Sequence, residues 1–244
     1  MAEELIGVHS ILEALRAGQR RLQRVHVAKG ADSEAVREIV ELARSQGVPV
    51  RRESRETLDR LAGGQRAHQG VVALAGEGAY SSFAEILEAE NPFFVILDGV
   101  QDPHNLGAVI RTAEAAGATG LIVPERRTAP LSAVVARSSA GAIEHVPIVQ
   151  VKNLVNTLRT LKQKRVWVVG VDPHGDTDWT DFDYTGPVAL VLGGEGGGIR
   201  RLVRQHCDVC VRLPMHGRID SLNVSVAAGI VLFEVVRQRG MGSA

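Results

Sequence analysis

The chain has 244 residues, of which 45% are hydrophobic and 23% are charged, so its composition is that of an ordinary soluble globular protein of one or two domains. Lysine plus arginine and aspartate plus glutamate both total 28, which gives no global field that would favour nucleic acid. The longest apolar runs have only strand length, which argues against a membrane span. The first residues lack the basic start of a signal peptide and two cysteines give no disulfide framework, so we expect a reducing cytoplasm.

The positive charge is unevenly distributed along the chain. From Ala14 to Ala31 there is no acidic residue, and the run holds five cations: Arg16, Arg20, Arg21, Arg24 and Lys29. Such a run is either a solvated face or a surface for nucleic acid, and both interpretations stay open at this point.

The first 76 residues alternate between short helices and short strands. A capping box at Ser10-Ile-Leu-Glu13 predicts the first helix start. We expect helices at about 10–18, 33–46 and 56–61 and strands at 25–28, 48–50 and 70–75. This alternation predicts a small α/β domain over residues 1–76. Two glycines at 76–79 favour a boundary, and a second capping box at Ser82-Phe-Ala-Glu85 opens a short helix within a linker over 77–92.

From Phe93 to the end the alternation restarts with longer elements, and residues 93–244 form the second predicted domain. Strands are expected at 93–98, 120–123, 146–150, 166–171, 188–193 and 208–213, and helices at 105–116, 130–140, 153–163, 198–205 and 221–238. This pattern is typical of a mostly parallel sheet covered on both faces. Ligands of such sheets bind beyond the carboxyl ends of the strands, which directs attention to the loops at 98–105, 193–198 and 213–221.

The last predicted helix is apolar on almost every side from Leu222 to Val236. We expect Ser221 or Asp220 to cap its start. A helix without a polar face needs a second cover besides its own sheet, such as a second subunit. The polar loop before this helix would then lie next to the free backbone N–H groups of the helix start, where a ligand can bind. The alternative is an ordinary turn between a strand and a helix.

The first loop holds Asp98, Asp102 and His104, which resemble metal ligands only superficially. Pro103 favours a rigid turn, no second cluster completes a coordination shell, and we expect no metal. Arg111 lies off the buried stripe of the following helix, where the ordinary alternative is a surface pair with Glu114.

The second loop, Gly193-Gly-Glu-Gly-Gly-Gly198, is a candidate for close approach of a backbone to a nucleotide-like ligand. Its glycine spacing matches neither a dinucleotide fingerprint nor a Walker loop. Glu195 is expected to order the loop. Cys207 and Cys210 have redox spacing, but residues three apart on a strand point to opposite faces, so we expect packing roles for both.

Three ordered motifs give the chain a specific resemblance. They are Asn105-Leu-Gly-Ala-Val-Ile-Arg-Thr-Ala, Leu192-Gly-Gly-Glu-Gly-Gly-Gly-Ile and Leu213-Pro-Met-His-Gly-Arg-Ile-Asp-Ser-Leu-Asn-Val-Ser. With them the region from Phe93 to Arg239 resembles the SpoU (TrmH-like) branch of the SPOUT methyltransferases. The N-terminal region, with His68-Gln-Gly-Val-Val-Ala, resembles the L30e-like substrate domain of family members that act on 23S ribosomal RNA. The resemblance implies an α/β fold with a deep C-terminal trefoil knot, S-adenosyl-L-methionine as the methyl donor, and a homodimer.

The resemblance also implies roles for individual residues. It makes Arg111 the catalytic arginine, helped by Asn105, Glu195, Ser221 and Asn223. It places the cofactor against main-chain groups near Gly193, Gly194, Leu213, Met215 and Leu222. Because free arginine titrates above about 12 and is a poor base, we expect Arg111 to bind a phosphate and stabilise the developing alkoxide.

The implied activity is 2′-O-methylation of a guanosine in 23S ribosomal RNA, with the five N-terminal cations as candidate RNA contacts. Two alternatives remain: the same chemistry on transfer RNA, and a non-catalytic RNA-binding factor in ribosome assembly.

Overall fold

The computed structural model describes residues 3–64, 68–76 and 80–241 and divides into two compact units. Unit 1 is Met1–Ala79 together with Pro130–His145, and unit 2 is Tyr80–Ala129 together with Val146–Ala244. No helix within the described ranges is long and apolar enough to cross a membrane. The expected boundary at residues 76–79 lies mostly outside the described residues.

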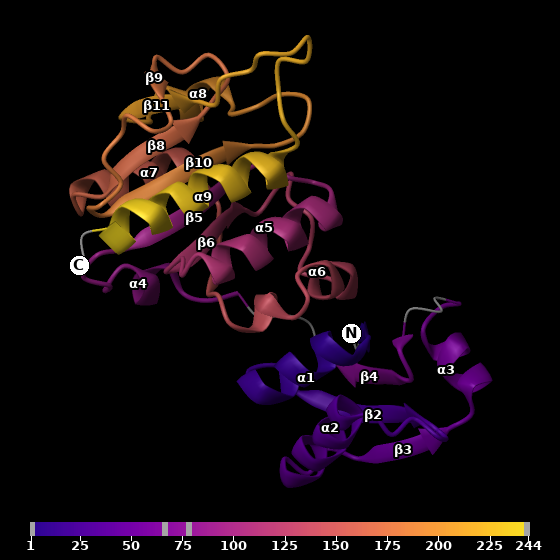
Figure 1. Cartoon of the computed structure of the whole chain (residues 1–244). Helices are drawn as coiled ribbons and strands as arrows, with labels where there is room; N and C mark the ends of the chain where they lie inside the picture. The colour runs from indigo at the N-terminus through magenta and orange to yellow at the C-terminus, as the bar shows by residue number, and fades with distance from the viewer. Residues whose placement is uncertain (1–2, 65–67, 77–79, 242–244) are drawn as a thin grey trace. The chain divides into compact units, whose positions relative to one another are not determined.

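Unit 1 is built on a four-stranded mixed sheet with the order β1-β4-β2-β3 (Figure 1). The strands are β1 (Glu3–Ile6), β2 (Leu22–Ala28), β3 (Val50–Glu53) and β4 (Val71–Ala75). The helices are α1 (Val8–Ala17), α2 (Glu34–Ser45) and α3 (Arg55–Leu61). The expected α/β alternation is therefore confirmed, while β1 adds a strand that the sequence did not predict.

The predicted capping box at the start of the first helix is wrong. Helix α1 begins two residues earlier, at Val8, and its N-cap is Gly7, whose φ of 98° suits glycine. Ser10 therefore lies inside the helix, where it is buried and its hydroxyl donates to the carbonyl of Ala136 at 3.3 Å. Ser10 therefore forms a tertiary hydrogen bond and does not cap the helix.

The segment Pro130–His145 belongs to unit 1, although the sequence placed it in the C-terminal domain. It contains α6 (Ala133–Ser138) and a 3-10 turn, η2 (Ala142–Glu144). Arg20 and Glu144 form an ion pair at 3.1 Å, with side chains only 2% and 5% exposed. His145 Nε2 also lies 2.7 Å from a carboxylate oxygen of Glu13. A fragment that begins near Ser82 would contain Glu144 but lack Arg20, so the Glu144 carboxylate would lose its cation. Such a fragment would therefore not represent unit 2 by itself.

Unit 2 is built on a seven-stranded sheet with the order β7-β6-β5-β10-β8-β11-β9, in which every neighbouring pair is parallel. The strands are β5 (Phe93–Asp98), β6 (Gly120–Pro124), β7 (Ile148–Val151), β8 (Trp167–Val171), β9 (Thr177–Asp178), β10 (Val188–Gly193) and β11 (Val209–Arg212). The central strand β5 is buried along its whole length, as its continuous apolar run predicts. All six predicted strands are present, and β9 is an addition.

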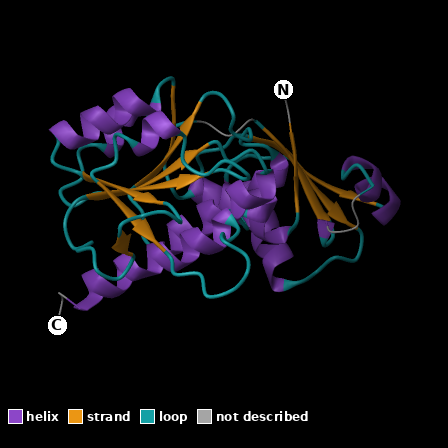
Figure 2. Ribbon diagram, turned by 90° about the horizontal axis from the view of Figure 1, so that it is seen from above, coloured by secondary structure: helices purple, strands orange, loops and turns teal. Residues whose placement is uncertain are grey.

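Helices cover both faces of this sheet, as expected (Figure 2). α5 (Pro103–Ala115) and α9 (Val224–Met241) lie side by side on one face, and α7 (Leu154–Gln163) and α8 (Arg201–Arg204) lie together on the other (Figure 1). The short α4 (Phe83–Ile86) carries the predicted capping box of Ser82 and Glu85. Since all strands are parallel, all their carboxyl ends meet at one edge.

Candidate active site

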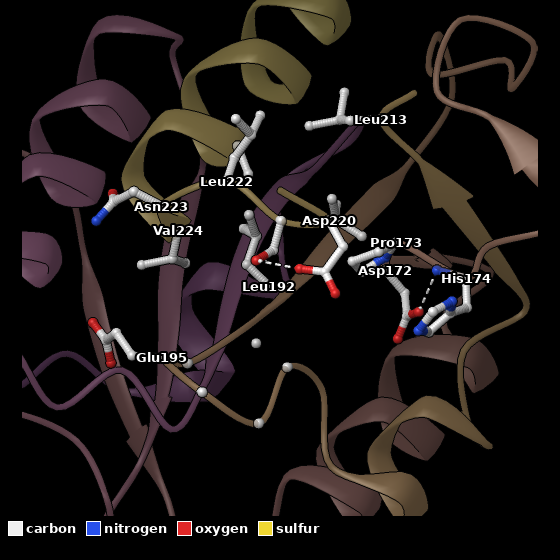
Figure 3. Close-up of a pocket in the computed structure, with 18 of the residues that line it drawn as sticks. Asp172, Pro173, His174, Leu192, Glu195, Leu213, Asp220, Leu222, Asn223 and Val224 are labelled. Carbon is white, nitrogen blue, oxygen red and sulfur yellow. Dashed lines mark hydrogen bonds between the residues drawn. The ribbon is translucent and has the colours of Figure 1, made fainter. Parts of the chain in front are cut away.

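A cavity of about 570 Å³ lies beyond the carboxyl ends of β8, β10 and β11 (Figure 3). Its walls come from the glycine loop after β10, the loop after β8, the loop after β11 and the start of α9. The lining residues are Val171–His174, Leu192–Gly198, Leu213, Met215, Asp220–Val224 and Ala227. A volume of this size lies within the range of about 300–1,000 Å³ that is typical of small-molecule and cofactor sites.

Every residue that the sequence assigned to the cofactor lines this cavity: Gly193, Gly194, Leu213, Met215 and Leu222. Three of the five expected catalytic residues, Glu195, Ser221 and Asn223, line it as well. Asn105 and Arg111 do not. The structure therefore brings together the second and third motifs around one space, while the individual roles stay predictions.

The sequence missed the loop of residues 172–174 on the opposite wall of the cavity. Asp172 is 9% exposed, and its carboxylate accepts a hydrogen bond from the backbone N–H of His174 at 2.8 Å. Arg204 contacts the other carboxylate oxygen at 3.2 Å. The sequence could have predicted this loop, because it follows the strand β8 directly. Ligands of parallel sheets bind beyond the carboxyl ends of the strands, which applies to this loop as to the other three loops.

The glycines at 193 and 194 allow the protein's own backbone segments to approach each other, in addition to lining the cavity. A Cβ at Gly193 would lie 2.0 Å from the carbonyl carbon of Gly198, and one at Gly194 would lie 2.0 Å from the carbonyl oxygen of Gly99. The loop therefore folds back on itself and against the turn after β5.

Asp98 anchors the end of the glycine loop through hydrogen bonds with Arg200. Its carboxylate is 2% exposed and accepts from the backbone N–H of Arg200 at 2.8 Å and from Nε of the same residue at 2.6 Å. Asp102 instead caps α5 by accepting from the N–H of His104 at 2.9 Å. Both carboxylates thus have partners, and no group of three potential ligands for a metal occurs among the described residues.

The three motif loops are joined by one chain of side-chain hydrogen bonds. Asn105 Nδ2 donates to Glu195 Oε1 at 2.6 Å, and Asn223 Nδ2 donates to Asn105 Oδ1 at 3.0 Å. The N–H and the hydroxyl of Ser225 both donate to Asn223 Oδ1, at 2.9 and 2.6 Å. Asn223 is therefore the cap of α9, which begins at Val224, and the expected caps Asp220 and Ser221 lie outside the helix.

The direction of this chain is fixed by its ends. A backbone N–H can only donate, so Ser225 sets the Asn223 amide with its oxygen toward the helix and its NH₂ toward Asn105. The amide of Asn105 must then accept from Asn223 and donate to Glu195, and an ionised carboxylate can only accept. Glu195 thus ends the chain as an acceptor, consistent with the expectation that it orders its loop.

Comparison with known proteins decides the family. The model described as "SpoU rRNA Methylase family" matches residues 92–233, which is more than half of the chain. The chain belongs to the SpoU rRNA methylase family. A second model, "RNA 2'-O ribose methyltransferase substrate binding", matches residues 5–80. The SpoU match spans Pro130–His145, so family membership alone would also have placed that segment with unit 2.

Relatives of the SpoU family match nearly the whole length of the chain. The chain is 43% identical to the 23S rRNA (guanosine-2'-O-)-methyltransferase RlmB of Yersinia pestis, covering 99% of each protein. It is 42% identical to the putative TrmH family tRNA/rRNA methyltransferase YacO of Bacillus subtilis, covering 96% of this chain and 95% of the relative. The SpoU methyltransferase AviRb from Streptomyces viridochromogenes, solved in complex with AdoMet, superimposes with a TM-score of 0.81 at 30% identity and covers 98% of this chain and 90% of its own.

Arg111, the arginine that the SpoU resemblance makes catalytic, lies exposed on α5. It is six residues beyond Asn105, about 9 Å along the helix axis. Within the described part of the chain it makes no ion pair, so the alternative of a surface pair with Glu114 is not observed. Its guanidinium is free to meet a substrate.

The five N-terminal cations proposed as RNA contacts of this SpoU protein differ sharply in their surroundings. Arg16 is paired with Glu13 at 2.8 Å and with Glu38 at 2.7 Å. Arg20 is buried against Glu144, which leaves little of its guanidinium exposed for the predicted RNA contact. Arg24 is half-buried, and Arg21 and Lys29 are exposed. Two cations beside the glycine loop are also paired, Arg200 with Asp98 and Arg204 with Asp172.

The two cysteines of this SpoU protein approach one point, which corrects the expectation that they face opposite sides. Both Sγ atoms lie 3.1 Å from the position that a Cβ on Gly170 would occupy. Burial raises the pKa of the Cys207 thiol to about 12 and also raises the pKa of Cys210. Thiolates are the reactive form, so these residues serve packing.

Proposed function

We propose that the protein transfers a methyl group from S-adenosylmethionine to the ribose 2′-oxygen of a guanosine in 23S ribosomal RNA. The methylase family model and the names of relatives such as RlmB support this activity. The observation that carries the proposal is the hydrogen-bond chain from Ser225 to Glu195, because it joins all three motif loops beside the cavity.

The chemistry of the cavity fits S-adenosylmethionine. Apolar side chains on its walls suit the adenosine, and three carboxylates, those of Asp172, Glu195 and Asp220, suit the positive sulfonium and ammonium groups. Bound cofactor supplies an electrophilic methyl group on sulfur. We assign Gly193, Gly194, Leu213, Met215 and Leu222 to its binding.

The polar residues beside the cavity position the ribose in this proposal. The Asn105 and Asn223 amides are held in one orientation by the chain of hydrogen bonds, so they present fixed groups to a substrate without reorganising. Ser221 bonds only weakly to Asp220, at 3.3 Å, and its hydroxyl can turn toward a ligand. Arg111 binds the adjacent phosphate and stabilises the negative charge that develops on the 2′-oxygen as the hydroxyl proton passes to solvent water.

A dimer is part of this proposal. An apolar stripe stays exposed on α9, where Val226 is 50%, Phe233 is 49% and Val236 is 37% exposed. The buried Val231 faces its own subunit and cannot report on assembly. Phe233→Glu should therefore give a monomer by light scattering at micromolar concentration, because a charge in an apolar interface is costly. Leu202→Glu, at a residue 57% exposed on the other face of the sheet, is the matched control and should leave the mass unchanged. A monomeric wild type would refute the dimer.

The trefoil knot and the L30e-like character of unit 1 stay predictions from the resemblance, and the cytoplasmic location stays a prediction from the cysteine content and the first residues. A ribosomal RNA substrate favours the cytoplasm. We also propose that unit 1 contributes to RNA binding, through Arg21 and Lys29 in place of the buried Arg20.

The activity is tested by mapping 2′-O-methyl groups in 23S ribosomal RNA and transfer RNA from cells with and without this gene. We expect one guanosine of 23S ribosomal RNA to lose its methyl group and to regain it with the wild-type gene but not with Asn105→Ala. Loss of methylation in transfer RNA alone would replace the proposed substrate. Unchanged methylation in both, with a ribosome-assembly defect, would favour the non-catalytic alternative.

A further inference from the structure

The carboxyl edge of the unit 2 sheet continues beyond the cofactor cavity, over β5, β6 and β7. Arg126 and Arg127 follow β6, and Lys152 follows β7; all three side chains are exposed. In the described parts of the chain none of the three makes an ion pair or a side-chain hydrogen bond. These cations, named here the edge cations, are thus unneutralised.

The loop that carries the edge cations leads to the active site. Its first residue, Glu125, donates its N–H to the carbonyl of Val151 at 2.9 Å, which places this end beside Lys152. Its last residue, Ala129, donates to the carbonyl of Val100 at 3.1 Å. The next residue after Val100 is Gln101, whose N–H faces Glu195 Oε2 at 3.4 Å. The loop therefore crosses from β7 to the hydrogen-bond chain.

The span fits a short stretch of polynucleotide. β7 and β5, the strand that leads to Asn105, are two strand spacings apart in the sheet order, which is about 10 Å at roughly 4.8 Å per spacing. This corresponds to about three stacked nucleotides at roughly 3.4 Å each. A strand with its target ribose at Asn105 can therefore place neighbouring phosphates over the edge cations.

The two halves of the edge differ in chemistry. The half over β8, β10 and β11 carries the cavity with its three carboxylates and suits a cation. The half over β6 and β7 carries the edge cations and suits an anion. None of the exposed large apolar side chains described for the chain lies in the loops after β6 and β7, so these loops lack the anchors of a protein-binding surface. Arg127 also has a positive φ of 64°, a backbone conformation that is uncommon for a non-glycine residue.

We infer that Arg126, Arg127 and Lys152 bind the phosphates of the RNA strand that flank the methylated ribose. This inference rests on the proposed function and adds a substrate track within unit 2. Phosphate contacts position the strand and carry little sequence information, so they affect affinity more than the choice of nucleotide.

The test compares two double substitutions in the full-length protein. Arg126→Ala with Arg127→Ala removes two edge cations. Lys164→Ala with Arg165→Ala removes two exposed cations at the opposite, amino edge, and Arg165 also has a positive φ, of 61°, which makes it a matched control. Binding of 23S ribosomal RNA transcript is measured without cofactor over a range of salt concentrations, and cofactor affinity is measured by calorimetry.

We expect the edge variant to bind RNA about tenfold more weakly near 0.1 M salt, with a salt slope lower by about 1.4 to 1.8, because two counterion-releasing contacts are lost. Its KM for RNA should rise in proportion, while kcat and cofactor affinity stay within about twofold. Replacing both arginines by lysine should keep most of the slope, because a phosphate contact needs only the charge. The control variant should match the wild type in every measurement.

The inference and the proposed function fail in different ways. If the wild type methylates 23S ribosomal RNA and the edge variant keeps its slope and KM, the track is wrong while the activity stands. An edge variant with normal RNA binding but poor methylation in cells would indicate a protein partner for this surface and would also overturn the track. A wild type that methylates no ribosomal RNA would overturn the proposed function, whereas its cofactor-free RNA binding would still test the edge cations.

Discussion

The cations of unit 1 and those of unit 2 look alike in the sequence and differ in their partners. In unit 1 the most conspicuous basic run holds Arg16, which two glutamates neutralise, and Arg20, which is buried against Glu144. In unit 2 the exposed Arg111, Arg126, Arg127 and Lys152 are scattered over two loops and a helix and have no acidic partner within the described ranges. The comparison teaches that the density of charge along a chain does not measure the charge that is free to bind RNA.

The largest expected effect concerns unit 1 and follows from removing the buried Arg20. Arg20→Ala leaves the Glu144 carboxylate buried without a cation, and losing one partner of a buried pair costs about 3–5 kcal/mol. Hydrogen exchange of α1 and of residues 130–145 in the full-length protein should accelerate strongly. Arg16→Ala, at an exposed pair, is the control and should change exchange little. Equal exchange in the two variants would contradict a structural role for Arg20.

The next largest effect lies on the unit 2 side. Arg111→Ala should lower the single-turnover rate of methyl transfer about 100- to 1,000-fold, because one preorganised donor to a developing charge is lost. Cofactor affinity by calorimetry should stay nearly unchanged, since Arg111 does not line the cavity.

Arg111→Lys tests whether a positive charge alone can replace the guanidinium of Arg111. A lysine offers a point charge without the planar fork, so the rate should remain severely reduced. A lysine variant with near-normal turnover would show that charge alone suffices, and would contradict the requirement for a planar, bidentate guanidinium.

The smallest expected effect separates the two units as RNA surfaces. Arg21→Ala with Lys29→Ala removes the exposed cations of the N-terminal run and should flatten the salt slope of RNA binding by up to about 1.8. Filter binding of 23S ribosomal RNA transcript across salt concentrations measures this slope. A slope equal to that of the wild type would make the run a solvated face and leave RNA binding to unit 2.

The sequence by itself determined the elements and the location of the site. Continuous apolar runs such as Phe93–Leu97 predicted buried parallel strands, and the rule of the carboxyl edge directed attention to the loops that hold Asn105, Glu195 and Ser221. These predictions succeeded because apolar periodicity and strand-to-loop order are local properties that hold before the chain is packed.

Only the tertiary structure decided which polar groups are partners. Arg20 finds Glu144 more than a hundred residues away, and Ser10 is held by Ala136, so neither burial could be read from neighbouring residues. The same holds for Asn105, which meets Glu195 and Asn223 from two distant loops. A buried polar group takes whichever partner the fold brings within about 3 Å, and a distance between remote segments is a property of the packed chain.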